Sequence, residues 1–311
     1  MTNTLISPNG TPASPYCFGT MQFGGRSDVD QSRAMYDATR AAGLNFFDTA
    51  HIYTDGASET LLGQFASNER DALIIATKCG YKGGSSRQNI LTTFDESRNR
   101  LGMDFIDVLY LHRWDGDTDL NETFDTLASL QQQGKIGVIG VSNFAAWQVM
   151  KAQAAAEKHG TSIAILQPMY NLVKRQAEVE ILPMATSEGF AVAPYSPLGG
   201  GLLTGKYSAG ETGRLSSDTR YAARYGLDWM HQAARDLAAI ANRENVHPAM
   251  LAVAWAAQNP AITAPIISAR TAEQLQPSLA ALDYRITPDL YAELSALTPT
   301  PPPATDRIEE A

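Results

Sequence analysis

Four polar side chains stand where three apolar segments of the sequence end. Asp48 closes the run LNFFD, and Tyr53 lies in the short loop that follows it. Lys78 comes directly after ALIIAT, and His112 comes directly after FIDVLYL. Buried parallel strands read as continuous apolar runs, and in a parallel barrel every strand ends on the face that carries the active-site loops. We therefore expect the four side chains to meet at one end of a barrel.

These residue types could together protonate an oxygen atom. The ordinary pKa of tyrosine, about 10, is far above neutral pH, so Tyr53 would need help to act as an acid. Lys78 could stabilise the phenolate, and Asp48 could supply the counter-charge that a buried ammonium needs. His112 could polarise a substrate carbonyl where negative charge develops. The set supplies no reductant, nucleophile or metal.

Each of the four also has an ordinary structural explanation. Asp48 or Lys78 alone at a strand end is most often half of an ion pair, Tyr53 could be a rim aromatic, and His112 a hydrogen-bonded core histidine. Their placement on three successive strand ends favours the catalytic interpretation. No histidine pair has HxH or HExxH spacing, so we expect no metal centre. Asp48 lacks the second strand-end carboxylate that a glycosidase needs.

Repeated strand and helix segments would position these side chains. Apolar strands are predicted near residues 16, 44, 72, 105, 136, 163, 190 and 262, and helices near 28, 57, 88, 121, 145, 175, 230 and 271. Eight such crossovers close into a (β/α)8 TIM barrel, which we predict as a single α/β domain of residues 1–311. Asn9-Gly10 predicts an N-terminal β-hairpin on its closed end.

Two further segments have a distinct composition. The segment 196–228, rich in Gly, Ser, Arg and Tyr, is predicted to be a long functional or mobile loop. After a final helix at 287–297, the proline-rich residues 298–311 are predicted to be a flexible tail.

The composition narrows the function classes. The chain has 311 residues, 44% of them hydrophobic, and a net charge of -9, which argues against a nucleic-acid partner. No apolar run approaches the roughly 20 residues of a membrane helix, and the first residues do not resemble a signal peptide. Cys17 and Cys79 do not make a disulfide framework, which suits a reducing cytoplasm. The oligomeric state does not follow from the sequence.

The second half of the predicted barrel face could bind a phosphate-bearing ligand. The loop PLGGGLLTGK after the seventh strand is rich in backbone donors, and an arginine stands where the helix after the eighth strand begins. The alternative is that the glycines only turn the chain. The residues involved are Ser142, Asn143, Gln167, Tyr195, Ser196, Lys206 and Arg270.

At this point the sequence resembles the aldo-keto reductases, nearly from end to end. The segments that carry the resemblance are FFDTAHIYTDGASETLLG, IATK, YLHR, IGVSNF, LQPMYNL, YSPLGGGLLTGKY, and PIISAR followed by AEQL. The resemblance to NADPH-dependent, bacterial-type members implies that Asp48, Tyr53, Lys78 and His112 are the catalytic residues. Tyr53 would be the proton donor to a carbonyl that receives hydride from a reduced nicotinamide.

The same resemblance implies a cofactor site for NADPH (NADP+). Thr20 and Met21 would lie beside the cofactor, Tyr195 would stack on the nicotinamide, and Arg270 would meet the 2′-phosphate. Where the family's adenine site usually continues from Gln274 to a Glu-Asn pair, this chain has Pro277 and Ser278, and Ser268 replaces a usual glycine. We expect adenine to be held several-fold less tightly. The remaining implied contacts are Ser142, Asn143 and Gln167 to the carboxamide and Ser196, Leu198, Gly201, Lys206 and Arg214 to the pyrophosphate.

The substrate mouth is predicted to form from the loops after strands one, four and seven. Phe23 and Trp114 are the substrate-binding candidates, together with Tyr81, some of the tyrosines and tryptophan between 207 and 229, and His51. Aromatic walls with few charges suit a small aldehyde or ketone of modest polarity, although these rings could equally anchor loops.

Two other function classes remain open from the sequence. The channel β-subunits share this family's fold and act as nucleotide-responsive binding partners, so a sensing or interaction role with slow reductase activity is one alternative. His112 suits efficient carbonyl reduction and favours the enzyme. A cofactor-free lyase or isomerase using Tyr53 and Lys78 is the other.

Overall fold

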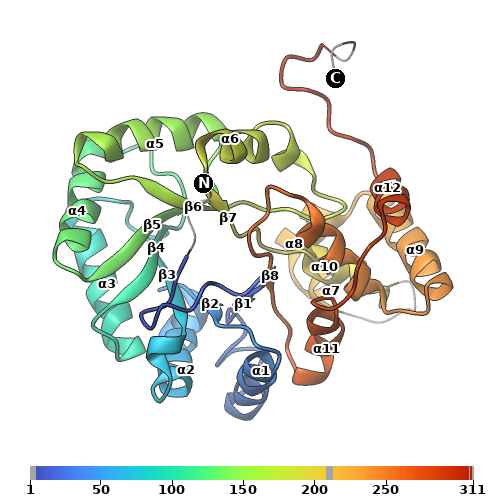
Figure 1. The fold of residues 1–311 in the computed structure, drawn as a ribbon, viewed down its shortest axis with the longest axis horizontal. Helices are drawn as coiled ribbons and strands as arrows, with labels where there is room; N and C mark the ends of the chain where they lie inside the picture. The colour runs from blue at the N-terminus through green and yellow to red at the C-terminus, as the bar shows by residue number, and fades with distance from the viewer. Residues whose placement is uncertain (1–4, 208–212, 308, 310–311) are drawn as a thin grey trace.

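The computed structural model describes residues 5–207, 213–307 and 309. Its strands form one eight-stranded parallel sheet in the order β7-β6-β5-β4-β3-β2-β1-β8. Figure 1 shows the strands in the middle of the molecule, with helices around them. The strand bounds are β1 (Cys17–Gly19), β2 (Phe46–Asp48), β3 (Ile74–Cys79), β4 (Ile106–Leu111), β5 (Ile136–Ser142), β6 (Ile163–Gln167), β7 (Ala191–Val192) and β8 (Ile266–Ile267).

Backbone hydrogen bonds close the sheet into a barrel. The N–H of Thr263 donates to the carbonyl of Val192 at 2.8 Å, and the N–H of Ile266 donates to the carbonyl of Pro194 at 2.8 Å. These bonds join the two ends of the strand order, so no edge strand is left unpaired along this seam. The predicted (β/α)8 barrel is confirmed.

The predicted hairpin at the N-terminus is also confirmed within the described residues. Ile6 and Pro12 form an antiparallel bridge, and Gly10 takes the positive φ of 88° that the turn requires. Leu5 belongs to the inner apolar cluster of the barrel, and the N–H of Ser14 donates to Asn45 just before β2. The hairpin therefore covers the end of the barrel where the strands begin.

Long helices connect the strands and pack outside them. Helices α1, α3 and α4 begin at side-chain caps, and α3 and α6 end at glycines with φ of 65° and 74°. The bounds are α1 (Val29–Ala41), α2 (Ala57–Ala66), α3 (Arg87–Leu101), α4 (Leu120–Gln132), α5 (Ala146–Lys158), α6 (Ile181–Glu188), α9 (Asp228–Arg243), α10 (Pro248–Gln258), α11 (Ala272–Ala280) and α12 (Pro288–Ala296).

Three sequence-based predictions of local structure need correction. The helix predicted near residue 175 begins at Ile181, after a single 3₁₀ turn, η3 (Gln176–Glu178). The segment 196–228 is not one long loop, because it contains η4 (Gly199–Thr204), α7 (Arg214–Ser217) and α8 (Thr219–Tyr225). Helix α10 was not predicted, because PAMLAVAWAAQ is buried on nearly every side and shows no amphipathic period.

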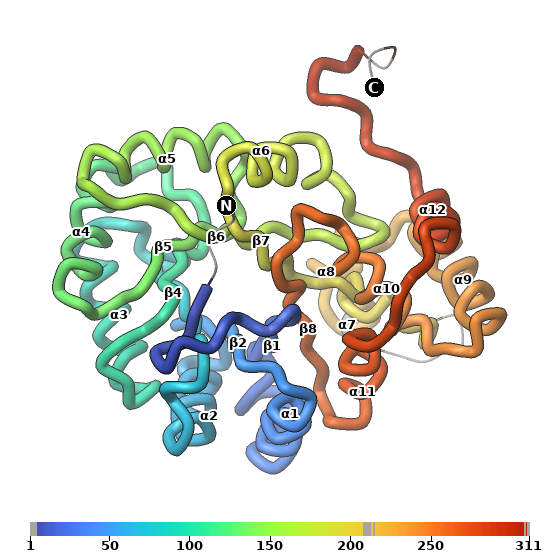
Figure 2. Tube along the Cα trace, in the orientation of Figure 1, coloured from blue at the N-terminus to red at the C-terminus, as the bar shows by residue number. Residues whose placement is uncertain are grey.

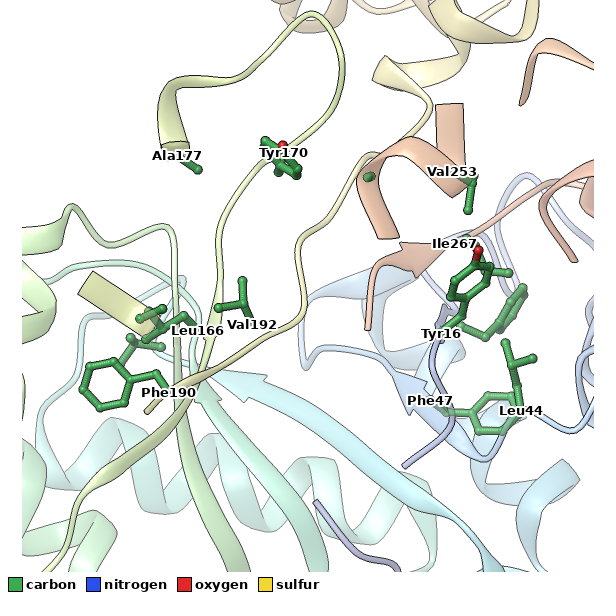
Figure 3. Packing of buried hydrophobic residues seen from close by; sticks show 14 of the residues in the cluster. Tyr16, Leu44, Phe47, Leu166, Tyr170, Ala177, Phe190, Val192, Val253 and Ile267 are labelled. Carbon is green, nitrogen blue, oxygen red and sulfur yellow. The ribbon is translucent and has the colours of Figure 1, made fainter. Parts of the chain in front are cut away.

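Two apolar layers result from the alternation of side chains along each strand. Phe46, Ile74 and Val108 point into the barrel, whereas their neighbours Phe47 and Leu109 face the helices. Figure 3 shows part of the outer layer, and there the rings of Tyr16 and Phe47 lie close to Leu44 and Ile267. The inner layer fills the barrel below the open end.

The last described residues leave the barrel. After α12 the chain runs away from the helices, as Figure 2 shows in red. Whether this segment is flexible stays a prediction. Among the described residues, no helix combines the length and apolar character needed to cross a membrane.

Candidate active site

The strand alternation places the predicted catalytic residues inside the barrel mouth. Asp48 shares its face of β2 with inward-pointing Phe46, and Lys78 shares its face of β3 with Ile74. His112 follows the last residue of β4 and is buried, with 7% of its surface exposed. The three strands are neighbours in the sheet, so these side chains converge as predicted.

Lys78 and Asp48 form a buried ion pair. The ammonium Nζ of Lys78 lies 2.6 Å from Oδ2 of Asp48 and also donates to the carbonyl of Thr49 at 2.7 Å. Gln167 donates to the other oxygen, Oδ1, of Asp48 at 2.9 Å. Burial alone would lower the pKa of Lys78, but the Asp48 carboxylate and Tyr53 together outweigh burial and the pKa is raised. Lys78 is therefore held as a cation.

Tyr53 lies beside this cation. Its hydroxyl accepts a hydrogen bond from Lys78 Nζ at 3.4 Å, and the same nitrogen lies 4.9 Å from the ring centroid. Burial raises the pKa of Tyr53, while the Lys78 charge lowers it in opposition. The phenol consequently keeps its proton at neutral pH, and Lys78 reduces the cost of losing it.

A strained turn holds the backbone of Tyr53. The 3₁₀ helix η1 (Tyr53–Gly56) contains Thr54 and Asp55 at φ of 48° and 52°, a conformation that non-glycine residues rarely adopt. Thr54 Oγ1 donates to the carbonyl of Phe23 at 2.8 Å and accepts from the N–H of Ser58 at 2.9 Å. These bonds fix the loop that presents the phenol.

His112 is the fourth member and is neutral. Burial, followed by the nearby charges of Lys78 and Arg113, lowers the pKa of His112 to about 2. Its ring packs edge-on against Tyr53, with 5.7 Å between the ring centroids. A neutral imidazole carries one N–H donor, so His112 can donate to a substrate oxygen without delivering a full charge.

Four of the predicted cofactor residues form one hydrogen-bonded network with the catalytic group. Ser142 Oγ donates to the carbonyl of Gln167 at 3.1 Å. Asn143 Nδ2 donates to the carbonyl of His112 at 2.9 Å, and Tyr195 donates its hydroxyl proton to Asn143 Oδ1 at 2.7 Å. The ends of β5, β6 and β7 are thereby tied to Asp48 and His112.

Two predicted cofactor residues follow β1. Thr20 is fully buried, and its Oγ1 donates to the carbonyl of Asp48 at 3.1 Å, so it supports the catalytic strand end. Met21 is next in the chain and half-buried. Thr20 therefore has a structural role, and Met21 retains surface for a ligand.

The glycine-rich segment after β7 is a compact 3₁₀ turn. Ser196 precedes it at φ of 62°, Leu198 caps it, and Gly201 within it has φ of 95°. The positive φ of Gly201 favours glycine, and a Cβ atom there would also crowd the ammonium of Lys206, at 3.1 Å from Nζ. The side chain of Arg214 lies outside the described part of the structure.

The residues after β8 offer groups that fit a nucleotide. Thr271 caps α11 by accepting a bond from the N–H of Gln274, and Arg270 immediately precedes it. The hydroxyls of Ser268 and Ser278 are buried and find no hydrogen-bond partner among the described residues. Ser268 precedes α11 and Ser278 lies in its last turn, and unpaired buried hydroxyls of this kind suit the polar edge of a bound ligand.

The two predicted substrate-binding residues lie in different surroundings. Phe23 is fully buried and packs against Phe18 and Phe65, so its ring has no surface to offer a substrate. The prediction that Phe23 binds substrate is therefore corrected: its ring anchors the loop after β1 in the core. Trp114 is half-buried and packs edge-on against Phe144.

One supporting group was not found from the sequence. Glu59 is completely buried, and it accepts bonds from Thr77 Oγ1 at 2.6 Å and from Arg100 Nη1 at 3.2 Å. The same arginine nitrogen donates to the carbonyl of His51 at 3.0 Å. This network braces the chain beside both Lys78 and Tyr53. The only sequence signal was an acidic residue within the first turn of a helix.

Comparison with known proteins agrees with this geometry. Residues 15–298 match the Aldo/keto reductase family. The oxidoreductase YrpG of Bacillus subtilis is 32% identical over 97% of this chain and 97% of its own length. A probable voltage-gated potassium channel subunit beta of Oryza sativa is 32% identical over 97% of this chain and 98% of its own length. The norsolorinic acid reductase stcV of Emericella nidulans is 32% identical over 95% of this chain and 81% of its own length.

The match covers both the strands that carry the four catalytic candidates and the strands that carry the predicted cofactor contacts. The general role that follows is that of an oxidoreductase. The chain belongs to the Aldo/keto reductase family.

Proposed function

We propose that the protein reduces an aldehyde or ketone to an alcohol, using NADPH as the hydride source and Tyr53 as the proton donor. The observation that carries this proposal is the position of Lys78 Nζ, which lies 2.6 Å from Asp48 and 3.4 Å from the Tyr53 hydroxyl. A phenol beside a paired, buried cation is an acid prepared for proton transfer.

Each catalytic residue has a distinct task in this proposal. A bound reduced nicotinamide would supply the hydride that the carbonyl carbon accepts. Tyr53 gives its proton to the carbonyl oxygen, and Lys78 stabilises the phenolate that remains. Neutral His112 donates a hydrogen bond to the same oxygen and orients the carbonyl. Asp48 keeps Lys78 charged within the barrel.

The residues around the barrel mouth fit the cofactor. Ser142, Asn143 and Gln167 offer donors and acceptors for a carboxamide, and Tyr195 offers a ring for the nicotinamide. The turn around Gly201 would hold the pyrophosphate together with Ser196, Leu198 and Lys206. Arg270 would pair with the 2′-phosphate, which favours NADPH over NADH.

The test follows the loss of NADPH absorbance with a reactive aromatic aldehyde. In the Tyr53→Phe variant we expect kcat to fall by about three orders of magnitude or more, since proton transfer is lost, while NADPH still binds. Tyr284→Phe is the matched control, because it removes the hydroxyl of a partly exposed tyrosine that precedes α12. Full turnover in Tyr53→Phe would refute the assignment of the proton donor.

A second candidate function is a nucleotide-responsive binding partner. It is favoured by the likeness to the probable channel β-subunit of Oryza sativa, which spans nearly both chains. The two functions differ in the expected rate of carbonyl reduction. An efficient reductase uses His112 to hold the carbonyl, whereas a binding partner needs only slow reduction or none. If the protein binds NADPH but reduces no member of a broad carbonyl panel, the binding role would be preferred.

A further inference from the structure

Arg113 lies one aromatic ring away from the catalytic imidazole. The ring of Tyr81 is 4.9 Å from that of His112, centroid to centroid, and the guanidinium of Arg113 is 5.2 Å from the Tyr81 centroid. Arg113 is exposed, and it forms no ion pair with any acidic residue that the structure describes. A cation is thus available at the mouth next to the place where the carbonyl must sit.

Helix α8 brings a second cation to the open end. Its Tyr221 packs against the turn after β7, where a Cβ on Gly200 would come within 2.7 Å of the ring. The guanidinium of Arg224 lies 5.2 Å from the Tyr221 centroid, and its charge lowers the pKa of Tyr195 against the larger effect of burial. Arg224 is therefore close to the rim of the site and not out on the far surface.

Lys174, in the loop after β6, adds a third positive charge. Its ammonium lies 5.8 Å from the ring centroid of Tyr225, the last residue of α8. Burial, and then the charge of Arg224, lowers the pKa of Lys174, so the two cations repel one another. Neither pairs with an acidic side chain in the described residues, and an incoming anion would relieve the repulsion.

Two of these cations, Arg113 and Lys174, lie in the loops after β4 and β6, and Arg224 lies in α8, in a chain whose net charge is -9. A local positive rim on an acidic protein attracts anions to the site and repels them elsewhere. Tyr81 and Tyr221, two of the aromatic residues expected at the mouth, each have a guanidinium against the ring, and the buried Tyr225 has the ammonium of Lys174 against its ring. The mouth is consequently less suited to an uncharged substrate than its aromatic content suggests.

We propose that the mouth selects carbonyl substrates that carry an anionic group, such as a carboxylate, which Arg113, Lys174 and Arg224 bind. The inference rests on the proposed reductase function and adds the class of its substrate. The carboxylate would lie at the rim while the carbonyl reaches Tyr53 and His112. Charge-assisted bonds to guanidinium groups are the strongest means of recognising such a group.

The experiment compares two aldehydes that differ in charge. The kcat/KM of the purified protein with NADPH is measured for 4-carboxybenzaldehyde and for its uncharged methyl ester, methyl 4-formylbenzoate. We expect the carboxylate to be preferred about tenfold, with a preference that shrinks as ionic strength rises. In Arg113→Gln and Arg224→Gln, the ratio of the two kcat/KM values should fall about fivefold or more.

The control is Arg243→Gln, which removes an exposed arginine paired with Glu293, and its ratio should equal that of the unaltered protein. Equal kcat/KM values for the two aldehydes, or equal losses for both in the variants, would overturn the inference while leaving the reductase intact. A weaker NADPH affinity in Arg224→Gln with an unchanged ratio would also overturn it, since the cation would then serve the cofactor. Reduction of neither aldehyde would contradict the proposed function itself.

Discussion

The ammonium of Lys78 lies 2.6 Å from the carboxylate of Asp48, and both side chains are almost completely buried. The first prediction concerns this pair. Lys78→Met should lower the free energy of unfolding by about 3 to 5 kcal/mol, because Asp48 is left as an uncompensated buried charge. Activity should also fall by about three orders of magnitude. Denaturant unfolding and steady-state kinetics measure the two effects.

The double variant with Asp48→Asn is the control for that prediction. It removes both charges, so it should recover part of the lost stability without recovering activity. If the double variant were as unstable as the sum of the single variants, the two groups would not be acting as an ion pair.

The pKa of His112 predicts how stability depends on pH. Burial, with Lys78 and Arg113, lowers this pKa to about 2. In the unfolded chain the histidine takes up a proton near its ordinary value of about 6.5, so below that pH protons favour unfolding. When the pH is lowered from 7 to 5.5, the free energy of unfolding should fall in the unaltered protein by about 1 kcal/mol more than it falls in the His112→Gln variant. Equal losses in denaturant titrations would show that the folded imidazole does protonate.

Arg270 is predicted to set the cofactor preference. Its backbone is held where α11 begins, since Ser27 Oγ donates to its carbonyl at 2.9 Å. Arg270→Met should weaken NADPH binding about tenfold or more and leave NADH binding nearly unchanged, because only NADPH carries the 2′-phosphate. Fluorescence titration measures both affinities. The exposed Arg285→Met is the control, and a similar loss for the two cofactors would contradict the assignment.

The buried Glu59 predicts a stability defect with a specific remedy. In Arg100→Gln, the carboxylate loses the cation 3.2 Å away and keeps Thr77 as its one side-chain partner among the described residues, so Tm should fall by about 5 °C. Adding Glu59→Gln removes the uncompensated charge and should restore part of that loss, as followed by circular dichroism. A further fall in Tm would mean that the pair contributes through packing and not through charge.

The barrel could be predicted from sequence because its strands are buried on both faces. Runs such as ALIIAT and FIDVLYL identify the strands, and Gly102 and Gly189 mark the preceding helix ends. The catalytic group followed because Asp48 and Lys78 come at the ends of neighbouring strands. The position of a residue along a strand determines to which side of the sheet its side chain points. The convergence of Asp48 and Lys78 could therefore be predicted without tertiary information.

The rest depends on packing that a sequence does not display. Phe23 follows a strand as a mouth residue would, yet its ring turns into the core against Phe18. The burial of Glu59 comes from Arg100, 41 residues away in the chain. Arg224 lies near the rim because α8 packs against the turn after β7, where Tyr221 meets Gly200. No periodic pattern in the sequence predicts this packing.

The most direct test of the central claim is a single-turnover measurement of NADPH oxidation in the Tyr53→Phe variant. The enzyme, present in excess over NADPH and mixed with it beforehand, is then mixed with an aldehyde. Each NADPH reacts once, so product release does not limit the rate. We predict that the cofactor binds as in the unaltered protein and that the single-turnover rate falls about a thousandfold, with no solvent isotope effect from a tyrosine proton. A rate close to that of the unaltered protein would contradict the account, because the proton would then come from another group.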